Sequence, residues 1–490
     1  MRKMAMLLAA MLAPGVIVGA ALAADAVKKD QSILDRLYAH TGVYNKSAAA
    51  TMPGFVSDPG WPAPLPHSWL LGQVAGLYVD QHDHVWISNR PRTMTTDEAG
   101  LETRGGGPTG NGEVKNGQGF ARPNGAVADC CNAAPSVLEF DTAGKLLRAW
   151  GGPADPGWLE SHCKAADGCI WPNSEHGIYI DHKDNVWIAG NGARPVDPAS
   201  SWTTHKDGAD GFVLKFDMNG NFKMRIGGTP SGPASNDTSG GINGTPLLYL
   251  PADMVVDPKT NRLYIADGYG NRRILVVDAD SGKYIGHFGA YGGNPVDDAA
   301  AAAGGRWVTD RLKGVKKPAF FRNPVHCVKI ADDGKIYVCD RGNDRIQVFD
   351  SNDAALGKPC SNPDGVAGKC GFLAEQAISA NTETMPAMPG TSVSLNFSKD
   401  KAQSCLYVGD NSNMTIYVLN RSNLQELGRL GRSGRDAGQF HWLHQVSLDS
   451  KGNIYTAEVD SGKRIQKFVR YGAAGCSGAG SATVGGVVAK

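Results

Sequence analysis

The sequence predicts an all-β fold, a six-bladed β-propeller with long loop insertions on one face. The main observation is a repeat in which an apolar strand, a polar turn and a second strand follow one another, with apolar residues at every second strand position. This alternation, interrupted by Asp, Gly and Asn, is typical of antiparallel strands and not of helices. The six copies begin near Leu77, His176, Ala252, His326, Val393 and His444.

Further strands between these copies supply the other half of each blade. A third strand follows the second in several copies, as at 273–278, 345–350 and 464–469. Turn-containing segments that continue outward occur at 136–152, 211–228, 274–290 and 415–431. A four-stranded sheet that repeats around an axis is a propeller blade, so the copies of the repeat predict six blades.

The ends of the chain lie outside this repeat. Residues 1–23 combine a basic start, an apolar run and a small-residue cleavage site, which is the pattern of a signal peptide. We therefore expect a periplasmic or secreted protein with no membrane anchor, because no later apolar run is long enough to span a bilayer. The expected segments are an N-terminal extension at 24–69, the propeller at 70–471 and a flexible Gly- and Ala-rich tail at 472–490.

The charge balance limits the classes of partner. The chain has 49 Lys and Arg against 48 Asp and Glu, which gives a net charge of +1 at pH 7. A nearly neutral chain lacks the basic surface that nucleic acids require. We expect a small-molecule or peptide substrate, and the propeller face could also bind a protein partner.

Ten cysteines in an exported chain favour disulfides over metal ligands or redox thiols. Cys327 and Cys339 stand opposite each other across a predicted hairpin, where their side chains can meet. Spacing within loops also favours two more pairs, Cys163 with Cys169 and Cys360 with Cys370. The alternative is a zinc site, with a spacing unlike that of a ribbon or finger, formed by Cys130, Cys131, Cys163 and Cys169.

Three long insertions interrupt the repeats, at 91–135, 291–320 and 351–392. Such segments between propeller blades usually cover one face, where ligands bind. The Gly-rich run at 105–112 resembles a phosphate-binding loop only in composition, because no strand precedes it and no helix follows. We therefore expect all three insertions to be loops.

Three histidines occupy the same position in alternate copies of the repeat. His176, His326 and His444 each stand five residues before the first residue of the turn. Alternate blades of a six-bladed ring are about 120° apart, which is the arrangement that three ligands of a four-coordinate zinc need. Three imidazoles with an open fourth position are typical of a catalytic zinc. In the other three copies this position is small or apolar: Ala75, Ala252 and Val393.

Two further side chains are predicted at the same end of the propeller. Antiparallel pairing places the start of the first strand beside the end of the second. Arg90 ends one second strand and Tyr269 follows another, so both are candidates for catalysis. Other arginines open a third strand shortly after an acidic residue and are expected to form structural ion pairs: Arg273 with Asp267, Arg345 with Asp340, and Arg464 with Glu458.

The repeat resembles that of the NHL-repeat propellers, and specifically the peptidyl-α-hydroxyglycine α-amidating lyase domain. The resemblance is carried by four segments, 71–90, 176–190, 266–278 and 321–350. It extends over about 70–470 and is interrupted by the insertions, which repeat architectures tolerate.

This resemblance implies a role for each candidate residue. It makes Tyr269 the base and places Arg90 beside the substrate, where its charge would favour the phenolate. It assigns zinc to the three histidines, and a structural calcium to the backbone carbonyls of Leu77 and Ile178. The chain departs from the family pattern at three positions: Gln445 replaces an acidic calcium ligand and puts calcium in doubt, Trp442 replaces a pocket methionine, and Gly270 replaces a cysteine.

The reaction that the resemblance implies is cleavage of the C–N bond of a carbinolamide, by an exported zinc-dependent lyase of the peptidylamidoglycolate lyase type. Zinc would acidify the substrate hydroxyl, and collapse of the alkoxide would expel an amide and leave an aldehyde. Two other functions use the same fold and ligands. One is a non-catalytic NHL propeller that binds a protein or small ligand, and the other is a zinc hydrolase that activates water.

Overall fold

The computed structural model describes most of the chain between residues 52 and 476. The described residues are 52–95, 98, 131–152, 163–193, 208–233, 236–295, 314–315, 317–379, 390–471 and 476. The expected signal peptide and most of the insertion at 91–135 lie outside these ranges.

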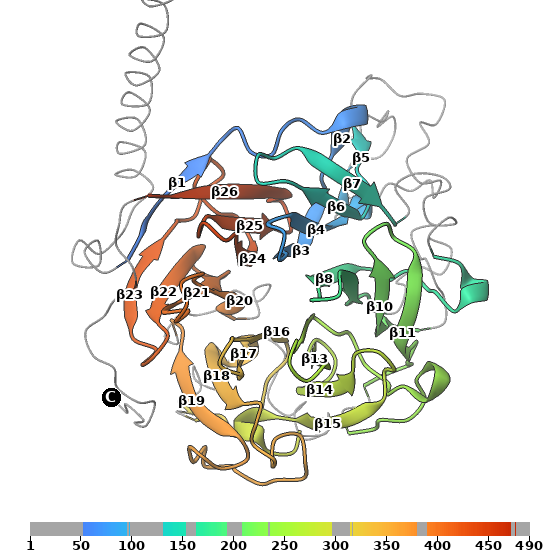
Figure 1. Ribbon diagram of the computed structural model, residues 1–490, viewed down its shortest axis with the longest axis vertical. Helices are drawn as coiled ribbons and strands as arrows, with labels where there is room; N and C mark the ends of the chain where they lie inside the picture. Colours follow the sequence, from blue (N-terminus) through green and yellow to red (C-terminus); the bar gives the residue numbers. More distant parts are fainter. Residues whose placement is uncertain are drawn as a thin grey trace, which may run out of the picture.

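Six antiparallel sheets of four strands surround one axis, which confirms the predicted propeller (Figure 1). The strands of each blade are given from the axis outward. Blade 1 consists of β3 (Gln73–Val79), β4 (Val85–Arg90), β6 (Val137–Phe140) and β7 (Leu146–Trp150), and blade 2 of β8 (Glu175–Ile180), β9 (Asn185–Gly190), β10 (Gly211–Asp217) and β11 (Phe222–Gly228). Blade 3 consists of β12 (Asp253–Val256), β13 (Arg262–Asp267), β14 (Arg273–Asp278) and β15 (Tyr284–Phe288).

The other three blades follow the same order. Blade 4 consists of β16 (Val325–Ile330), β17 (Lys335–Asp340), β18 (Arg345–Asp350) and β19 (Phe372–Ala377), and blade 5 of β20 (Ser392–Phe397), β21 (Cys405–Asp410), β22 (Thr415–Asn420) and β23 (Glu426–Leu430). Blade 6 consists of β24 (Leu443–Leu448), β25 (Ile454–Glu458), β26 (Arg464–Tyr471) and β1 (Gly54–Asp58).

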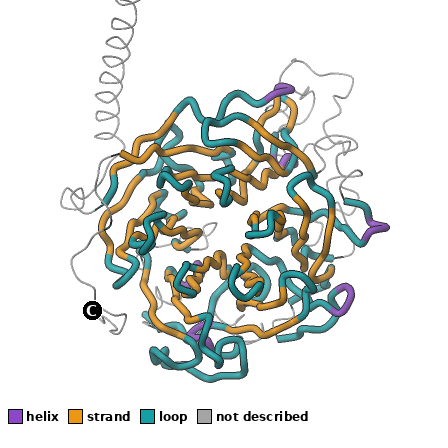
Figure 2. Tube along the Cα trace, viewed as in Figure 1, coloured by secondary structure: helices purple, strands orange, loops and turns teal. Residues whose placement is uncertain are grey.

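Regular structure outside the blades is sparse (Figure 2). The short strands β2 (Trp69–Leu70) and β5 (Asn132–Ala133) pair in parallel. The helices within the described ranges are single 3-10 turns, namely η2 (Pro66–Ser68), η3 (Pro91–Thr93), η4 (Ala165–Asp167), η5 (Ile242–Gly244), η6 (Ala290–Gly292) and η7 (Arg341–Asn343). No helix in the part of the chain that the structure describes has the length and hydropathy that crossing a membrane requires.

A carboxylate at the tip of the first hairpin sets the register of several blades. In blade 2, Asp181 Oδ1 accepts hydrogen bonds from the backbone amides of Lys183 and Asn185, both at 2.9 Å, and Asp181 Oδ2 accepts one from Trp187 Nε1 at 2.8 Å. Asp80 forms the same set of bonds in blade 1. Because an Asp side chain that closes a turn in this way fixes where the strands begin, counting residues back from it locates the axial end of each inner strand.

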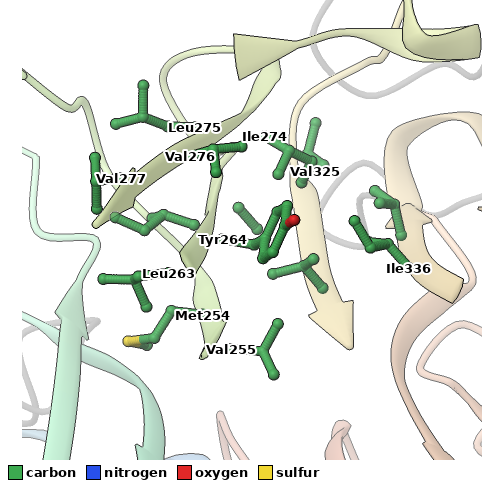
Figure 3. Packing of buried hydrophobic residues seen from close by; sticks show 14 of the residues in the cluster. Met254, Val255, Leu263, Tyr264, Ile274, Leu275, Val276, Val277, Val325 and Ile336 are labelled. Atoms are coloured by element: carbon green, nitrogen blue, oxygen red, sulfur yellow. The ribbon is translucent and has the colours of Figure 1, made fainter. Parts of the chain in front are cut away.

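The core lies between neighbouring blades as well as within them. Figure 3 shows Tyr264 of blade 3 beside Val325 and Ile336 of blade 4, and all three side chains are at most 2% exposed. Burial of apolar surface contributes roughly 25 cal/mol per Å². The inner strands are buried at nearly every position because both of their faces are covered.

The ring is closed by strand β1, which forms the outer edge of blade 6 against β26, with Val56 opposite Val469. This corrects the predicted boundary of the propeller, because part of the expected N-terminal extension (24–69) belongs to it. The first strand among the described residues thus completes the last blade, so ring closure joins segments that are more than 400 residues apart.

Disulfides support this arrangement, and all three predicted pairs are confirmed: Cys163–Cys169, Cys327–Cys339 and Cys360–Cys370. A further bond joins Cys405 to Cys476 and so ties one residue of the expected flexible tail (472–490) to blade 5. Bonds of this kind persist in oxidising compartments, which indicates an extracellular or secreted protein.

The expectation that residues 351–392 form only a loop is wrong, because this insertion contains β19, the outer strand of blade 4. Most of β19 is only half-buried. Its apolar residues therefore do not alternate as those of the inner strands do.

We expect Phe55→Ala to lower the free energy of unfolding by about 3 kcal/mol, the usual cost of truncating a buried phenylalanine. Phe55 is 4% exposed on β1 and packs edge-on against Tyr407 of blade 5. Urea denaturation would measure the loss. The control is Leu147→Ala on the outer strand β7, where the side chain is 38% exposed and the cost should stay below about 1 kcal/mol. Equal losses would contradict a specific role of β1 in closure.

Candidate metal centre

The structure brings the three predicted histidines together on the propeller axis. His176, His326 and His444 lie on β8, β16 and β24, and none is more than 3% exposed. Their ring centroids are 4.8 to 4.9 Å apart in all three pairs. One ligand atom from each lies within 4.8 Å of the others. This nearly equilateral arrangement is the one that alternate blades were expected to give.

A β-bulge lies at each histidine. The pairing of inner and second strands shifts between Glu175 and Ile178, between Val325 and Cys327, and between Leu443 and Gln445. Bulges bend a strand and redirect a side chain, and they are frequent next to active sites. Here they lie at the points where the imidazoles turn toward the axis.

Each imidazole is fixed by the backbone of the next blade. The Nδ1 atoms of His176, His326 and His444 hydrogen-bond to the carbonyls of Ala252, Val393 and Ala75, at 2.6, 2.5 and 2.7 Å. A carbonyl can only accept, so Nδ1 carries the proton and Nε2 keeps its lone pair. This second interaction orients metal-binding histidines in general. The acceptors are the small or apolar residues that occupy the histidine position in the other three blades.

Two glycines allow this close approach. A Cβ atom at Gly177 would lie 2.5 Å from the Ala252 carbonyl oxygen that holds His176, and one at Gly268 would lie 1.9 Å from the carbonyl oxygen of Val325, next to His326. Neither contact is sterically possible for another residue without a backbone shift. These glycines therefore set the spacing between blades at the site.

The electrostatic surroundings keep the three imidazoles neutral. The pKa of each histidine lies well below 6.5, mainly because burial disfavours the imidazolium. The guanidinium of Arg341 acts in the same direction on all three, and that of Arg90 acts on His176 and His444. Since a metal binds the neutral imidazole, these three Nε2 atoms fit a divalent ion that prefers nitrogen ligands.

The structure places Tyr269 directly beside these ligands. Its hydroxyl lies 2.9 Å from His326 Nε2 and 3.2 Å from His176 Nε2. The loop after β13 is held by hydrogen bonds from the Tyr269 amide to the Leu250 carbonyl and from Asn323 Nδ2 to the Tyr269 carbonyl, both 3.1 Å. A phenol, which can exchange a proton, is thus within hydrogen-bonding distance of two of the Nε2 atoms.

The predicted arginine, Arg90, lies at the rim of this site and does not contact Tyr269. It donates to the Glu175 carbonyl at 2.6 Å, to Gln73 Oε1 at 3.1 Å and to Asn191 Oδ1 at 3.0 Å. Its charge still reaches Tyr269 electrostatically.

The sequence analysis did not find Arg341, whose Nη1 donates to the Tyr269 hydroxyl at 3.4 Å. It directly follows β17, as Arg90 ends β4, and this shared register position is the signal that could have identified it. The ion pairs expected for the other arginines are confirmed: Arg273–Asp267, Arg345–Asp340 and Arg464–Glu458.

The residues proposed for calcium do not fit a calcium ion. Gln445 is neutral, and its Oε1 accepts a hydrogen bond from Ser394 Oγ at 2.9 Å. The nearest carboxylate in the same register is Asp253, which is paired with Lys329 Nζ at 2.6 Å. Calcium prefers several anionic or carbonyl oxygens, and here only the buried strand positions Leu77 and Ile178 would contribute carbonyls.

A second group with metal-ligand chemistry consists of Asp80, His84 and Glu139. Its atoms already have protein partners, because His84 Nδ1 lies 2.7 Å from Glu139 Oε1 and Arg148 pairs with the other oxygen. The alternative zinc site at cysteines is ruled out by the Cys163–Cys169 bond, and Cys131 is also disulfide-bonded.

Comparisons with known proteins agree with this fold. A family model described as NHL repeat matches residues 325–349. Peptidyl-glycine alpha-amidating monooxygenase B of Xenopus laevis is 23% identical over 218 residues, covering 44% of this chain and 20% of that protein. The A form from the same organism is 28% identical over 173 residues, covering 31% and 16%. NHL repeat-containing protein 3 of Mus musculus is 26% identical over 224 residues, covering 44% and 46%.

The chain is therefore a six-bladed propeller that contains an NHL repeat. Within that class it is distantly related to the peptidyl-glycine alpha-amidating monooxygenases. The matched region spans a fifth or less of the length of those two enzymes.

We expect the purified protein to carry about one zinc per chain, and His326→Ala to lose most of it, because a site with two remaining imidazoles binds far more weakly. Elemental analysis after dialysis would measure the content. His84→Ala is the matched control, since His84 belongs to the other candidate cluster and should leave the metal content unchanged. Metal loss in His84→Ala, with full retention in His326→Ala, would place the ion elsewhere.

Calcium at 1 mM should shift the unfolding temperature by less than about 1 °C, because a ligand that binds weakly adds little stability. Differential scanning calorimetry of the zinc-loaded protein would show this. Gln445→Asp restores an anionic oxygen and should increase the calcium-dependent shift. A large shift in the unsubstituted protein would mean that other oxygens compensate for Gln445.

Proposed function

We propose that this protein is an exported, zinc-dependent carbon–nitrogen lyase that cleaves a carbinolamide, with zinc held by His176, His326 and His444. The observation that carries the proposal is the Tyr269 hydroxyl, which lies within hydrogen-bonding distance of two candidate ligand nitrogens and of Arg341. A binding propeller has no need of a proton-exchanging group at this point. The distant relationship to the amidating monooxygenases supports the same reaction class.

This reaction moves one proton from oxygen to nitrogen in two transfers and needs no redox step. A metal bound to the three imidazoles would lower the pKa of a substrate hydroxyl. Tyr269 takes the hydroxyl proton, the C–O bond becomes a carbonyl, and the C–N bond breaks. The proton then returns to the departing amide nitrogen, so that one amide and one aldehyde leave the site. Tyr269 is placed to act as base first and as acid afterwards.

Two cations near Tyr269, the buried Arg341 and the half-buried Arg90, support one kind of substrate. Arg90 and Arg341 have no carboxylate within ion-pair distance among the residues that the structure describes. A buried charge without a counter-ion is costly. A substrate that brings a carboxylate, such as a peptidyl-α-hydroxyglycine, would compensate it. The aldehyde product would then be glyoxylate.

Export of the enzyme is part of the same proposal. Four disulfides join described cysteines, and the Cys405–Cys476 bond spans 71 residues. Such bonds form outside the reducing cytoplasm. The expected signal peptide at 1–23 agrees with this compartment but lies outside the described residues.

Turnover of a peptidyl-α-hydroxyglycine should fall roughly 10²- to 10⁴-fold in Tyr269→Phe, the usual contribution of a positioned acid or base. Zinc content and unfolding temperature should stay close to those of the unsubstituted protein. Tyr291→Phe is the matched control. The Tyr291 hydroxyl also contacts an arginine, since it accepts a hydrogen bond from Arg345 Nη1 at 2.7 Å, but none of its hydrogen bonds involves the three histidines. Steady-state kinetics of both variants would test the assignment.

The alternatives predict different results. A zinc hydrolase would cleave esters or amides and depend little on Tyr269. A non-catalytic propeller would bind zinc and turn over neither substrate class. Full lyase activity in Tyr269→Phe would remove this residue as the base, even if the overall reaction were confirmed.

A further inference from the structure

At the end of the second strand, one register position carries the same residue type in opposite blades for two of the three blade pairs. From the strand pairings, the equivalent positions in blades 1 and 4 are Arg90 and Arg341, and those in blades 2 and 5 are Asn191 and Asn411. Blades opposite each other in a six-bladed ring are about 180° apart. The propeller therefore carries two Arg-Asn pairs on opposite sides of the histidine centre.

The two pairs make the same contact. Arg90 Nη2 donates to Asn191 Oδ1 at 3.0 Å, and Arg341 Nη2 donates to Asn411 Oδ1 at 2.6 Å. In each case the asparagine belongs to the blade after that of the arginine. Because a guanidinium only donates, the amide oxygen must face it, and the amide orientation is fixed.

The partners of these arginines differ in charge from those of the structural arginines. Arg273 and Arg345 each bind a carboxylate, at 2.9 and 2.7 Å. For Arg345, burial lowers the pKa but the carboxylates of Asp340 and Glu375 outweigh it, so the pKa is raised. For Arg90 and Arg341 burial dominates and the pKa is lowered. An amide holds the guanidinium in place without bringing a carboxylate into contact with it.

Asn411 has no evident structural reason to be an asparagine. It is completely buried, and its Nδ2 has no hydrogen-bond partner in the part of the chain that the structure describes. A buried donor without a partner costs stability. What the side chain does provide is a neutral acceptor for Arg341.

We propose that Asn191 and Asn411 are positioning residues that hold the two site arginines without neutralising them, so that the site selects ligands that carry a carboxylate. This proposal rests on the proposed function, from which it takes the location of the ligand beside Tyr269. It goes further in assigning anion selectivity to two asparagines that touch neither the histidines nor Tyr269 in the described contacts.

The test compares the binding of two probes to the zinc-loaded protein by calorimetry. N-benzoylglycine carries a carboxylate and lacks the hydroxyl group that would allow cleavage, and N-benzoylglycinamide is its neutral counterpart. The unsubstituted protein should bind the acid at least about tenfold more tightly than the amide. Asn411→Asp and Asn191→Asp keep the size of the side chain and its acceptor but add a negative charge. Each should reduce this preference roughly 10- to 100-fold.

The control is Asn423→Asp, which adds the same charge at an exposed turn in blade 5 and should leave the preference unchanged. A merely structural role would weaken binding of both probes equally and leave their ratio intact. Because Asn191 is only half-buried, its variant remains informative if Asn411→Asp does not fold.

Two outcomes would overturn the proposal: Asp variants that keep the preference for the acid, or an unsubstituted protein that does not distinguish the probes. Neither depends on turnover. If the protein binds the acid selectively but does not cleave a carbinolamide, the proposed lyase reaction fails and the anion site stands.

Discussion

The hydrogen bond from each histidine Nδ1 to a carbonyl of the next blade is the contact on which the site depends. The three bonds link blade 2 to 3, blade 4 to 5 and blade 6 to 1. The last of them, from His444 to Ala75, crosses the point where the ring closes. The three Nε2 atoms therefore converge only in a closed ring, and the pairing of β1 with β26 is part of the site although it lies on the outer rim.

The position of the histidines could be predicted because a short-range interaction fixes it. The turn carboxylates of Asp181 and Asp449 accept hydrogen bonds from the amides that follow them, which fixes the count from turn to strand end in blades 2 and 6. In blade 4, where the turn begins at Ala331, backbone hydrogen bonds within the turn keep the same count. Arg341 has the same register position as Arg90, but that position alone does not show that it is a site residue. Asp340 is near both Arg341 and Arg345 in sequence, and only the structure shows that it pairs with Arg345. Which arginine takes the carboxylate depends on side-chain packing.

Two of the outer strands could not be predicted from the sequence. β1 and β19 contain five and six residues, and neither follows the apolar alternation of the inner strands. Each becomes a strand by pairing with the strand beside it, β1 with β26 and β19 with β18, and not through a pattern in its own sequence. β1 has only three buried residues and β19 is mostly half-buried, so neither strand has a long apolar pattern that could identify it. The inner strands are covered on both faces and could be identified from their composition.

Charge along the axis supports the proposal that the centre takes an anionic ligand. In the register next to the histidines, the carboxylate of Asp253 is already neutralised by Lys329. At the level of the histidines the ligands are neutral, and two guanidiniums lie nearby without a carboxylate partner among the described residues. A divalent metal would add two positive charges to these, in surroundings where screening by water is weak. In the proposed function, a substrate carboxylate near Arg90 and Arg341 would offset these charges, while a metal at the histidines would acidify the substrate hydroxyl whose proton Tyr269 takes.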